Sequence, residues 1–160
     1  MLDIPLFARS CSNTFRFLSK AELARIPLLG YVIRRLYITV NRSDRRDRQR
    51  SIEVMKKTIE EGISVFLCPE GTRNISDAPL MPFKDGAFRL AIATQTPLAV
   101  LTVINSEKLL SPKTAIALSP GKIIAEWSAP IDTTGMTEAD VEMLKYKTME
   151  LMLEVLQRYS

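Results

Sequence analysis

One stretch constrains the fold of this chain more than any other: an apolar run at 63–68 that ends directly at Pro69–Arg73. The run is short, carries β-branched and aromatic residues and follows Gly62, so it is predicted to form a buried strand. The residues after it include a carboxylate, a glycine that lets a ligand approach the backbone, and an arginine whose planar donors fit phosphate. Such a strand tip is where α/β proteins place ligand sites. Taken alone, the stretch fits an ordinary turn with a surface ion pair as well as it fits a ligand site.

Strand-like and helix-like segments alternate along the chain. Strands are predicted at 14–18, 37–41, 63–68 and 97–104, with a hairpin of 115–118 and 122–127. Helices are predicted at 4–9, 22–26, 28–36, 44–61, 86–93 and 138–159, with a linker at 130–135. This order predicts an α/β fold, a single domain over 1–160 whose mostly parallel or mixed sheet is flanked by helices, with an antiparallel element near the C-terminus. The strands before Arg42 and Glu70 then end at one edge of the sheet.

Side-chain patterns give these helices their predicted faces and ends. Ser43 or Asp44 is predicted to cap the helix at 44–61, and Asp85 the helix at 86–93. The first helix is predicted to bury an apolar stripe of Ile52, Met55 and Ile59. The last helix is predicted to bury a longer stripe: Val141, Leu144, Leu151, Met152, Val155, Leu156 and Tyr159.

Four further blocks accompany Pro69–Arg73. They are 20–23 with Pro27 and Gly30 after it, 38–42, 82–86 and 96–100. In this order the blocks resemble the glycerolipid O-acyltransferase family, typified by 1-acyl-sn-glycerol-3-phosphate (lysophosphatidate) acyltransferases. The resemblance covers residues 1 to 104, and the order of the blocks is more specific than any one of them. The last block departs from the family pattern, because Val100 stands where a second proline is usual.

The resemblance implies a glycerol-3-phosphate acyltransferase-like fold and an activity. A fatty acyl group would pass from an acyl thioester to the free hydroxyl of 1-acyl-sn-glycerol-3-phosphate, forming phosphatidic acid in phospholipid biosynthesis. No cofactor is implied, because the coenzyme A or acyl carrier protein thioester is a substrate. The implied partners are this donor, the lysophospholipid acceptor and a membrane surface. The implied location is the cytoplasmic face of a membrane, peripheral or anchored by a segment ahead of Met1.

The family's chemistry depends on a histidine followed four residues later by an aspartate, and this chain has no histidine. Residues 1–6 resemble the second half of that motif, which gives Asp3 the role of the aspartate that orients the base. We therefore expect the chain to begin inside the motif at an internal methionine, with impaired activity. The alternative is a complete but inactive relative that binds lysophospholipid or an acyl carrier. The coding sequence directly upstream of Met1 would distinguish the two.

The resemblance places the acceptor site in two blocks, Arg42 in one and Glu70, Gly71, Thr72 and Arg73 in the other, with Lys20 and Lys84 as weaker candidates for anion contacts. Arg42 and Arg73 would hold the acceptor's phosphate. Gly71 and Thr72 would supply backbone or hydroxyl donors. Glu70 would position either Arg73 or the glycerol hydroxyl, and the sequence leaves both roles open.

Composition and charge narrow the kinds of partner and site that the chain can have. The net charge of +4 is compatible with phosphate-bearing or anionic lipid partners. Five arginines lie within 42–50, where a solvated face and attraction to lipid headgroups are both open; nucleic acid is disfavoured, since no aromatics interleave with them. The two cysteines show no metal spacing, no metal site is predicted, and Cys68 is interpreted as a small core residue. The longest uncharged stretch, 90–104, is too short to span a membrane.

Overall fold

The computed structural model describes residues 9–11, 13–20, 37–41, 44–72, 74–76, 78–105 and 121–159. The chain divides into two compact units, one of residues 13–68 and one of residues 1–12 and 69–160. The helices predicted at 22–26 and 28–36, most of the one at 4–9 and the strand at 115–118 lie outside the described residues. The single domain over 1–160 stays a prediction.

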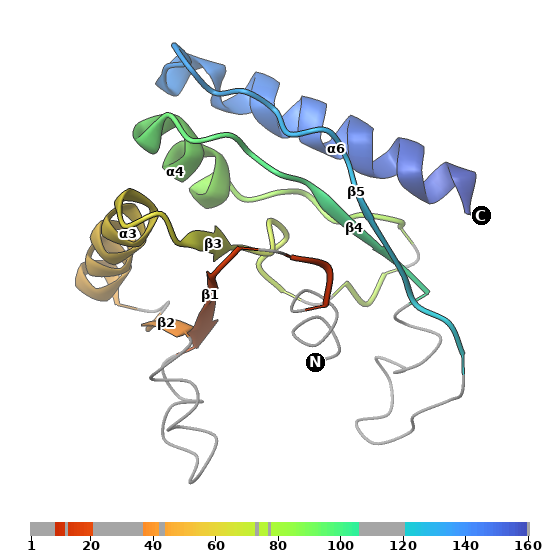
Figure 1. Cartoon of the computed structure of the whole chain (residues 1–160), viewed down its shortest axis with the longest axis horizontal. Helices are drawn as coiled ribbons and strands as arrows, with labels where there is room; N and C mark the ends of the chain where they lie inside the picture. Colours follow the sequence, from red (N-terminus) through yellow and green to blue (C-terminus); the bar gives the residue numbers. More distant parts are fainter. Residues whose placement is uncertain are drawn as a thin grey trace, which may run out of the picture. The chain divides into compact units, whose positions relative to one another are not determined.

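In its described part, the unit of residues 13–68 is a parallel sheet with helix α3 packed against it (Figure 1). Its elements are β1 (Phe15–Lys20), β2 (Tyr37–Val40), α3 (Arg45–Glu60) and β3 (Ser64–Phe66). β1 lies in the middle, in the order β2-β1-β3, and pairs in parallel with both neighbours. The predicted parallel sheet is therefore confirmed, and the carboxyl ends of its strands point to one edge.

Aromatic packing holds this sheet around Phe17, which is 7% exposed. Its ring centroid lies 4.9 Å from that of Phe66 on β3 and 5.5 Å from that of Tyr37 on β2. Phe15 on the same strand adds an edge contact at 5.3 Å. Such pairs stabilise a fold by about 0.5–1.5 kcal/mol beyond the area they bury. The central strand is thus fastened to both of its neighbours.

The last strand of this unit differs from the prediction. β3 covers only Ser64–Phe66, all three residues are half-buried, and Cys68 after them is exposed. The predictions of a buried strand over 63–68 and of Cys68 as a core residue are wrong. The physical reason is position: among the described strands β3 pairs with β1 alone, so it lies at an edge of its sheet.

The helix of this unit begins where the sequence predicted. Asp44 caps α3, since its Oδ1 accepts hydrogen bonds from the backbone N–H groups of Arg46 at 2.8 Å and Asp47 at 3.4 Å. The carboxylate of Asp47 in turn accepts a hydrogen bond from the backbone N–H of Asn41, just after β2. The two carboxylates therefore fix the connection from β2 into α3.

The buried face of α3 is not the predicted one. Met55 is buried as expected, but Ile52 is 41% exposed, and Ser51 and Thr58 are buried instead. Both hydroxyls donate to backbone carbonyls of the helix, at 2.7 Å each, to Arg48 and Val54 respectively. Because these bonds satisfy the hydroxyls, the small polar residues can lie against the sheet at little cost.

The described residues of the second unit include the helices α4 and α6 and an antiparallel strand pair. Its elements are α4 (Gly86–Thr94), β4 (Leu101–Ile104), β5 (Ile124–Trp127), the 3₁₀ turn η2 (Glu138–Asp140) and α6 (Val141–Arg158). β4 and β5 pair antiparallel, with Thr102 opposite Glu126. The antiparallel element expected near the C-terminus is confirmed. β5 belongs to the segment predicted as half of a hairpin, and the other half is undescribed.

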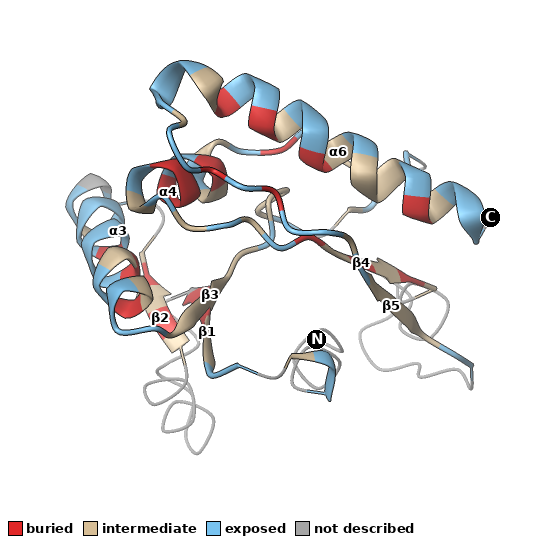
Figure 2. Ribbon diagram, turned by 45° about the horizontal axis from the view of Figure 1, so that its top comes forward, coloured by how far each residue is buried: buried red, intermediate tan, exposed pale blue. Residues whose placement is uncertain are grey.

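The core of this unit lies between α4 and α6, whose buried residues are red in Figure 2. It consists of Phe83, Phe88, Ile92, Val100, Ile131, Val141 and Leu144. Phe88 and Leu144 are each 1% exposed. The predicted apolar side of α6 is correct at Val141, Leu144 and Val155, but Tyr159 is exposed, because α6 ends one residue before it.

The segment predicted as a linker is part of the fold. Ile131 is 3% exposed and exchanges two backbone hydrogen bonds of 2.9 Å with Leu98. Thr133 is fully buried, and its Oγ1 donates to the carbonyl of Thr96 at 2.9 Å. The linker prediction for 130–135 is wrong, because partners more than 30 positions earlier in the chain supply the contacts that order it.

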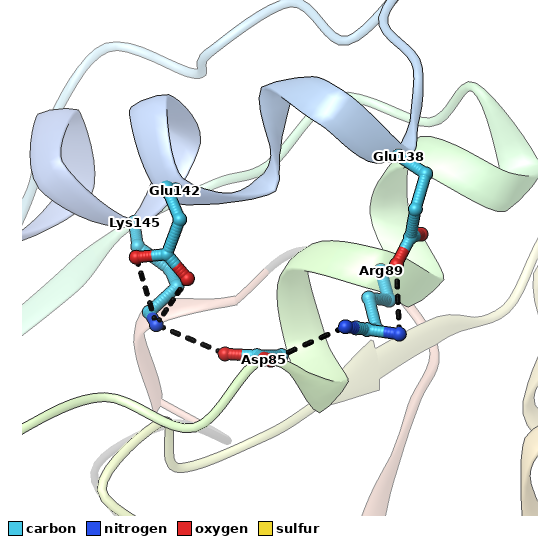
Figure 3. A network of polar contacts seen from close by, with 5 residues as sticks. All are labelled: Asp85, Arg89, Glu138, Glu142 and Lys145. Carbon is cyan, nitrogen blue, oxygen red and sulfur yellow. Dashed lines mark hydrogen bonds and ion pairs between the residues drawn. The ribbon is translucent and has the colours of Figure 1, made fainter.

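Asp85 occupies the cap position of α4, but its side chain makes no capping hydrogen bond. Its carboxylate contacts the Nζ of Lys145 at 2.9 Å and a guanidinium nitrogen of Arg89 at 3.4 Å (Figure 3). Arg89 also pairs with Glu138 at 2.7 Å, and Lys145 with Glu142 at 2.9 Å. The prediction that the Asp85 side chain caps α4 is therefore wrong, because its carboxylate instead links the start of α4 to α6.

We expect Asp85→Asn to lower the melting temperature by a few degrees at neutral pH and to have little effect in acid. The hydrogen bond from Lys145 lowers the pKa of Asp85, so its stabilisation is present above the ordinary carboxyl pKa and is lost as the pH falls through the lowered one. Thermal unfolding followed across pH, with the exposed Glu150→Gln as control, measures this. A difference that persists at the lowest pH would contradict the ion-pair explanation.

Candidate functional site

The turn at 69–72, which carries three of the predicted site residues, is fastened by the segment at 81–84. The backbone N–H of Lys84 donates to the carbonyl of Pro69 at 2.8 Å. The backbone N–H of Met81 donates to the carboxylate of Glu70. Glu70 and Gly71 are half-buried, and Thr72 is exposed. The turn is therefore held in shape while remaining open to solvent.

Gly71 is required in this turn for two reasons. Its φ of +70° lies in the left-handed region that other residues rarely adopt. A Cβ built on it would also lie 2.9 Å from Cδ and 3.0 Å from Nζ of Lys84. The Lys84 side chain thus lies across the glycine and brings an ammonium group to the turn. Lys84, one of the two weaker candidates, is thus in contact with a predicted site residue.

The carboxyl group of Glu70 has a raised pKa. Partial burial raises the pKa by disfavouring the charged form, and the hydrogen bond from the Met81 backbone opposes that effect. A half-buried carboxyl of this kind can accept a hydrogen bond from a hydroxyl or a guanidinium. The geometry is compatible with both roles that the sequence left open for Glu70.

We expect Glu70→Gln to raise stability slightly at neutral pH and to have no effect in acid. Because the pKa of Glu70 is raised in the folded protein, its protonated form stabilises the fold when the pH is below the ordinary carboxyl pKa. This stabilisation is lost as the pH rises through the raised pKa. Glutamine keeps an oxygen for the Met81 N–H but never ionises. Chemical denaturation at several pH values checks this, with Glu154→Gln on α6 as control. A loss of stability at neutral pH would instead indicate that a cation holds the carboxylate.

Just after the turn, Asn74 forms hydrogen bonds to Ser76 and Ala78. Asn74 Oδ1 accepts from both the backbone N–H and the hydroxyl of Ser76, at 2.9 and 2.7 Å. Its Nδ2 donates to the carbonyl of Ala78 at 2.8 Å. A loop is predicted from Asn74 to Pro82, and an asparagine that bonds the backbone two residues later is a common turn signal. This local bonding ends the turn that begins at Pro69.

The other predicted site residues are placed only in part. Lys20 ends β1, opposite Val40 of β2, so its backbone lies at the carboxyl edge of the parallel sheet. Its side chain, and the whole of Asp3, Arg42 and Arg73, lie outside the described residues. Their roles stay predictions. In the described part of the chain, no three residues of the metal-binding types are grouped, and no helix is long and apolar enough to span a membrane.

The fold and the turn define a class: an α/β protein with a glycine turn after a parallel strand and a lysine across it. The profile of the Acyltransferase family matches residues 1–104, and the chain belongs to this family. It has the fold of the 1-acyl-sn-glycerophosphate (LPA) acyltransferase PlsC from Thermotoga maritima. That crystal structure superposes with a TM-score of 0.82 at 24% identity, over 99% of this chain and 62% of that one. The expected acyltransferase-like α/β fold is confirmed.

Curated relatives share about a third of the matched residues. An uncharacterised acyltransferase of Schizosaccharomyces pombe is 31% identical over 92% of this chain and 53% of its own length. The 1-acyl-sn-glycerol-3-phosphate acyltransferase of Saccharomyces cerevisiae is 29% identical, over 98% and 52% respectively. The mouse 1-acyl-sn-glycerol-3-phosphate acyltransferase alpha is 32% identical, over 68% and 38%. This chain therefore spans about half or less of the length of these relatives.

Proposed function

We propose that this protein transfers a fatty acyl group from an acyl thioester to the free hydroxyl of 1-acyl-sn-glycerol-3-phosphate, forming phosphatidic acid. The observation that carries the proposal is the Lys84 ammonium held against Gly71, inside the family's signature block. Relatives bearing the name of this activity support it. The donor would be a coenzyme A or acyl carrier protein thioester, with no cofactor. The reaction would take place at a membrane surface, on its cytoplasmic face, where the lipid acceptor resides.

The reaction needs a base, donors for an oxyanion and a held acceptor. The acceptor's hydroxyl oxygen attacks the thioester carbonyl carbon and gives its proton to the base. The new C–O bond forms, the C–S bond breaks, and the thiol leaves. We assign the acceptor's phosphate to Arg42 and Arg73, with Lys84 adding a third positive charge and Lys20 a fourth. Gly71 and Thr72 would donate to acceptor or carbonyl oxygens, and Glu70 would accept from the glycerol hydroxyl or from Arg73.

Asp3 would orient an imidazole base, as in the motif that residues 1–6 resemble. The 160 residues contain no histidine, so we expect slow turnover, because general acid–base catalysis typically contributes about 10²- to 10⁴-fold. Free imidazole added to the assay should raise the rate. Rapid turnover without it would show that the mechanism does not depend on histidine.

The function is tested by binding as well as by turnover. The purified chain should bind a short-chain, water-soluble lysophosphatidate in calorimetry, and should bind the matching monoacylglycerol, which lacks the phosphate, far more weakly. Equal binding of the two would contradict a phosphate-reading site. The absence of histidine also favours a second candidate, an inactive relative that holds lysophospholipid or an acyl carrier. Tight lysophosphatidate binding with no turnover, even in imidazole, would select that candidate.

We expect Lys84→Met to weaken lysophosphatidate binding by about three- to tenfold, since a hydrogen bond to a charged group contributes roughly 1 kcal/mol or more. Methionine retains an unbranched chain to lie across Gly71 but carries no charge. The affinity should become less dependent on salt, because one fewer cation faces the phosphate. Calorimetry at two salt concentrations measures this. The exposed Lys122→Met is the matched control, and an equal loss in both variants would remove Lys84 from the site.

A further inference from the structure

We propose that the outward face of α3 binds the anionic headgroups of a lipid bilayer. This face is formed by Arg46, Arg50 and Lys57 and is called the basic face below. The inference rests on the proposed function, because a lysophosphatidate acceptor would reach the protein from such a surface. It goes further by naming the surface of the protein that makes the contact.

The three basic residues share one side of the helix. They are spaced by four and seven positions, which at 3.6 residues per turn places them in one row. All three are exposed, and Figure 2 shows the outward side of α3 in pale blue. Within the described ranges their charged groups make no ion pair. Glu53 lies in the same row, but its carboxylate pairs with Lys56 at 3.5 Å. Glu60 is exposed at the far end of the same row, so the row carries a net positive charge that is concentrated at Arg46 and Arg50.

The helix gains little from these charges. Arginines fill three of the first four positions of α3, the turn in which the helix dipole disfavours cations, and Arg50 follows in the next turn. The two acidic residues at this end are engaged with the backbone, Asp44 as the cap and Asp47 at Asn41. The guanidinium groups of Arg46 and Arg50 are thus neither needed for the fold nor neutralised by it. Such charges are suited to an anionic partner outside the protein.

Two observations favour a bilayer over a nucleic acid. Val54 lies next to the basic face and is 38% exposed, and an apolar side chain beside cations suits the boundary between headgroups and acyl chains. The sequence of α3 contains no aromatic residue on which a base could stack.

The topology of the unit adds a third point. Only residues 41–44 separate β2 from α3, so the basic end of the helix begins at the edge where the parallel strands end. In the sequence, Arg42, the predicted phosphate ligand, belongs to this short connection.

The experiment is sedimentation with lipid vesicles. The chain should bind phosphatidylcholine vesicles containing phosphatidylglycerol, and bind pure phosphatidylcholine vesicles much less. The double variant Arg46→Gln/Arg50→Gln should bind the anionic vesicles roughly twenty- to thirtyfold more weakly, since each basic residue near the surface contributes about a factor of five. Its melting temperature should not fall, because Arg46 opposes the helix dipole and neither guanidinium group forms an ion pair within the described ranges.

The matched control is Lys122→Gln/Lys147→Gln, which removes two exposed positive charges from the other unit. It should change vesicle binding by less than about threefold. An equal loss in both double variants, or binding that ignores phosphatidylglycerol, would overturn the inference. The inference would also be overturned if the Arg46→Gln/Arg50→Gln variant lost RNA binding but kept vesicle binding. Binding of short-chain lysophosphatidate without vesicles tests the proposed function separately, and the Arg46/Arg50 variant should retain it.

Discussion

Phe88→Ala is expected to destabilise the unit of residues 1–12 and 69–160 by about 3–5 kcal/mol, the range typical of a buried phenylalanine truncated to alanine. Phe88 is 1% exposed and lies in the core between α4 and α6. Its ring stacks on Phe83, with centroids 6.1 Å apart and planes within 15°. Because α4 also carries Asp85 and follows the segment that fastens the turn at 69–72, the loss should reach the candidate site.

Urea unfolding followed by tryptophan fluorescence measures this change directly. Trp127 is the one tryptophan of the chain and lies on β5, in the same unit as Phe88. Tyr146→Ala on α6 is the control, since this side chain is 70% exposed and its loss should cost no more than about 0.5 kcal/mol. A change below about 1 kcal/mol for Phe88→Ala would mean that this core does not hold the unit together.

The local features of the fold were predictable from the sequence. The bounds of α3, its Asp44 cap, and the strands β1 and β2 follow from capping residues, periodicity and β-branched runs. Ile52 shows where such reasoning ends, because an amphipathic pattern fixes the period of a helix but not which side meets the sheet. The buried hydroxyls of Ser51 and Thr58 were invisible to a pattern that counts apolar residues only.

Contacts between distant segments account for the other differences. Asp85 has the sequence of a helix cap, yet its partner Lys145 lies 60 positions later and determines where the carboxylate bonds. Ile131 is flanked by turn-forming residues and gave no strand signal, yet Leu98 pairs with it. The sequence identified Gly71 and Lys84 separately, through their two motif blocks. The position of the Lys84 side chain across Gly71 depends on the fold and does not follow from either block alone.

Gly71→Val is expected to lower the affinity for lysophosphatidate by tenfold or more while the chain stays folded. The left-handed conformation costs a side-chain-bearing residue about 1–2 kcal/mol, and a β-branched one is the least suited to it. The new Cβ would also overlap Cδ and Nζ of Lys84, so the ammonium group must move or the turn must open. Loss of the ammonium contact accounts for about three- to tenfold, as for Lys84→Met, and an altered turn adds the loss of the donors proposed at Gly71 and Thr72.

Calorimetry with short-chain lysophosphatidate measures the affinity, and thermal unfolding separates a local change from global unfolding. Gly62→Val is the matched control, because Gly62 has a similar φ of +78° but no atom within 4 Å of its would-be Cβ. Both variants carry the backbone strain, and only the one at Gly71 displaces Lys84. Combining Gly71→Val with Lys84→Met should then cost little more than Gly71→Val alone, because the first substitution has already removed the ammonium group from the turn. Fully additive losses would indicate that the glycine and the lysine act on the acceptor independently.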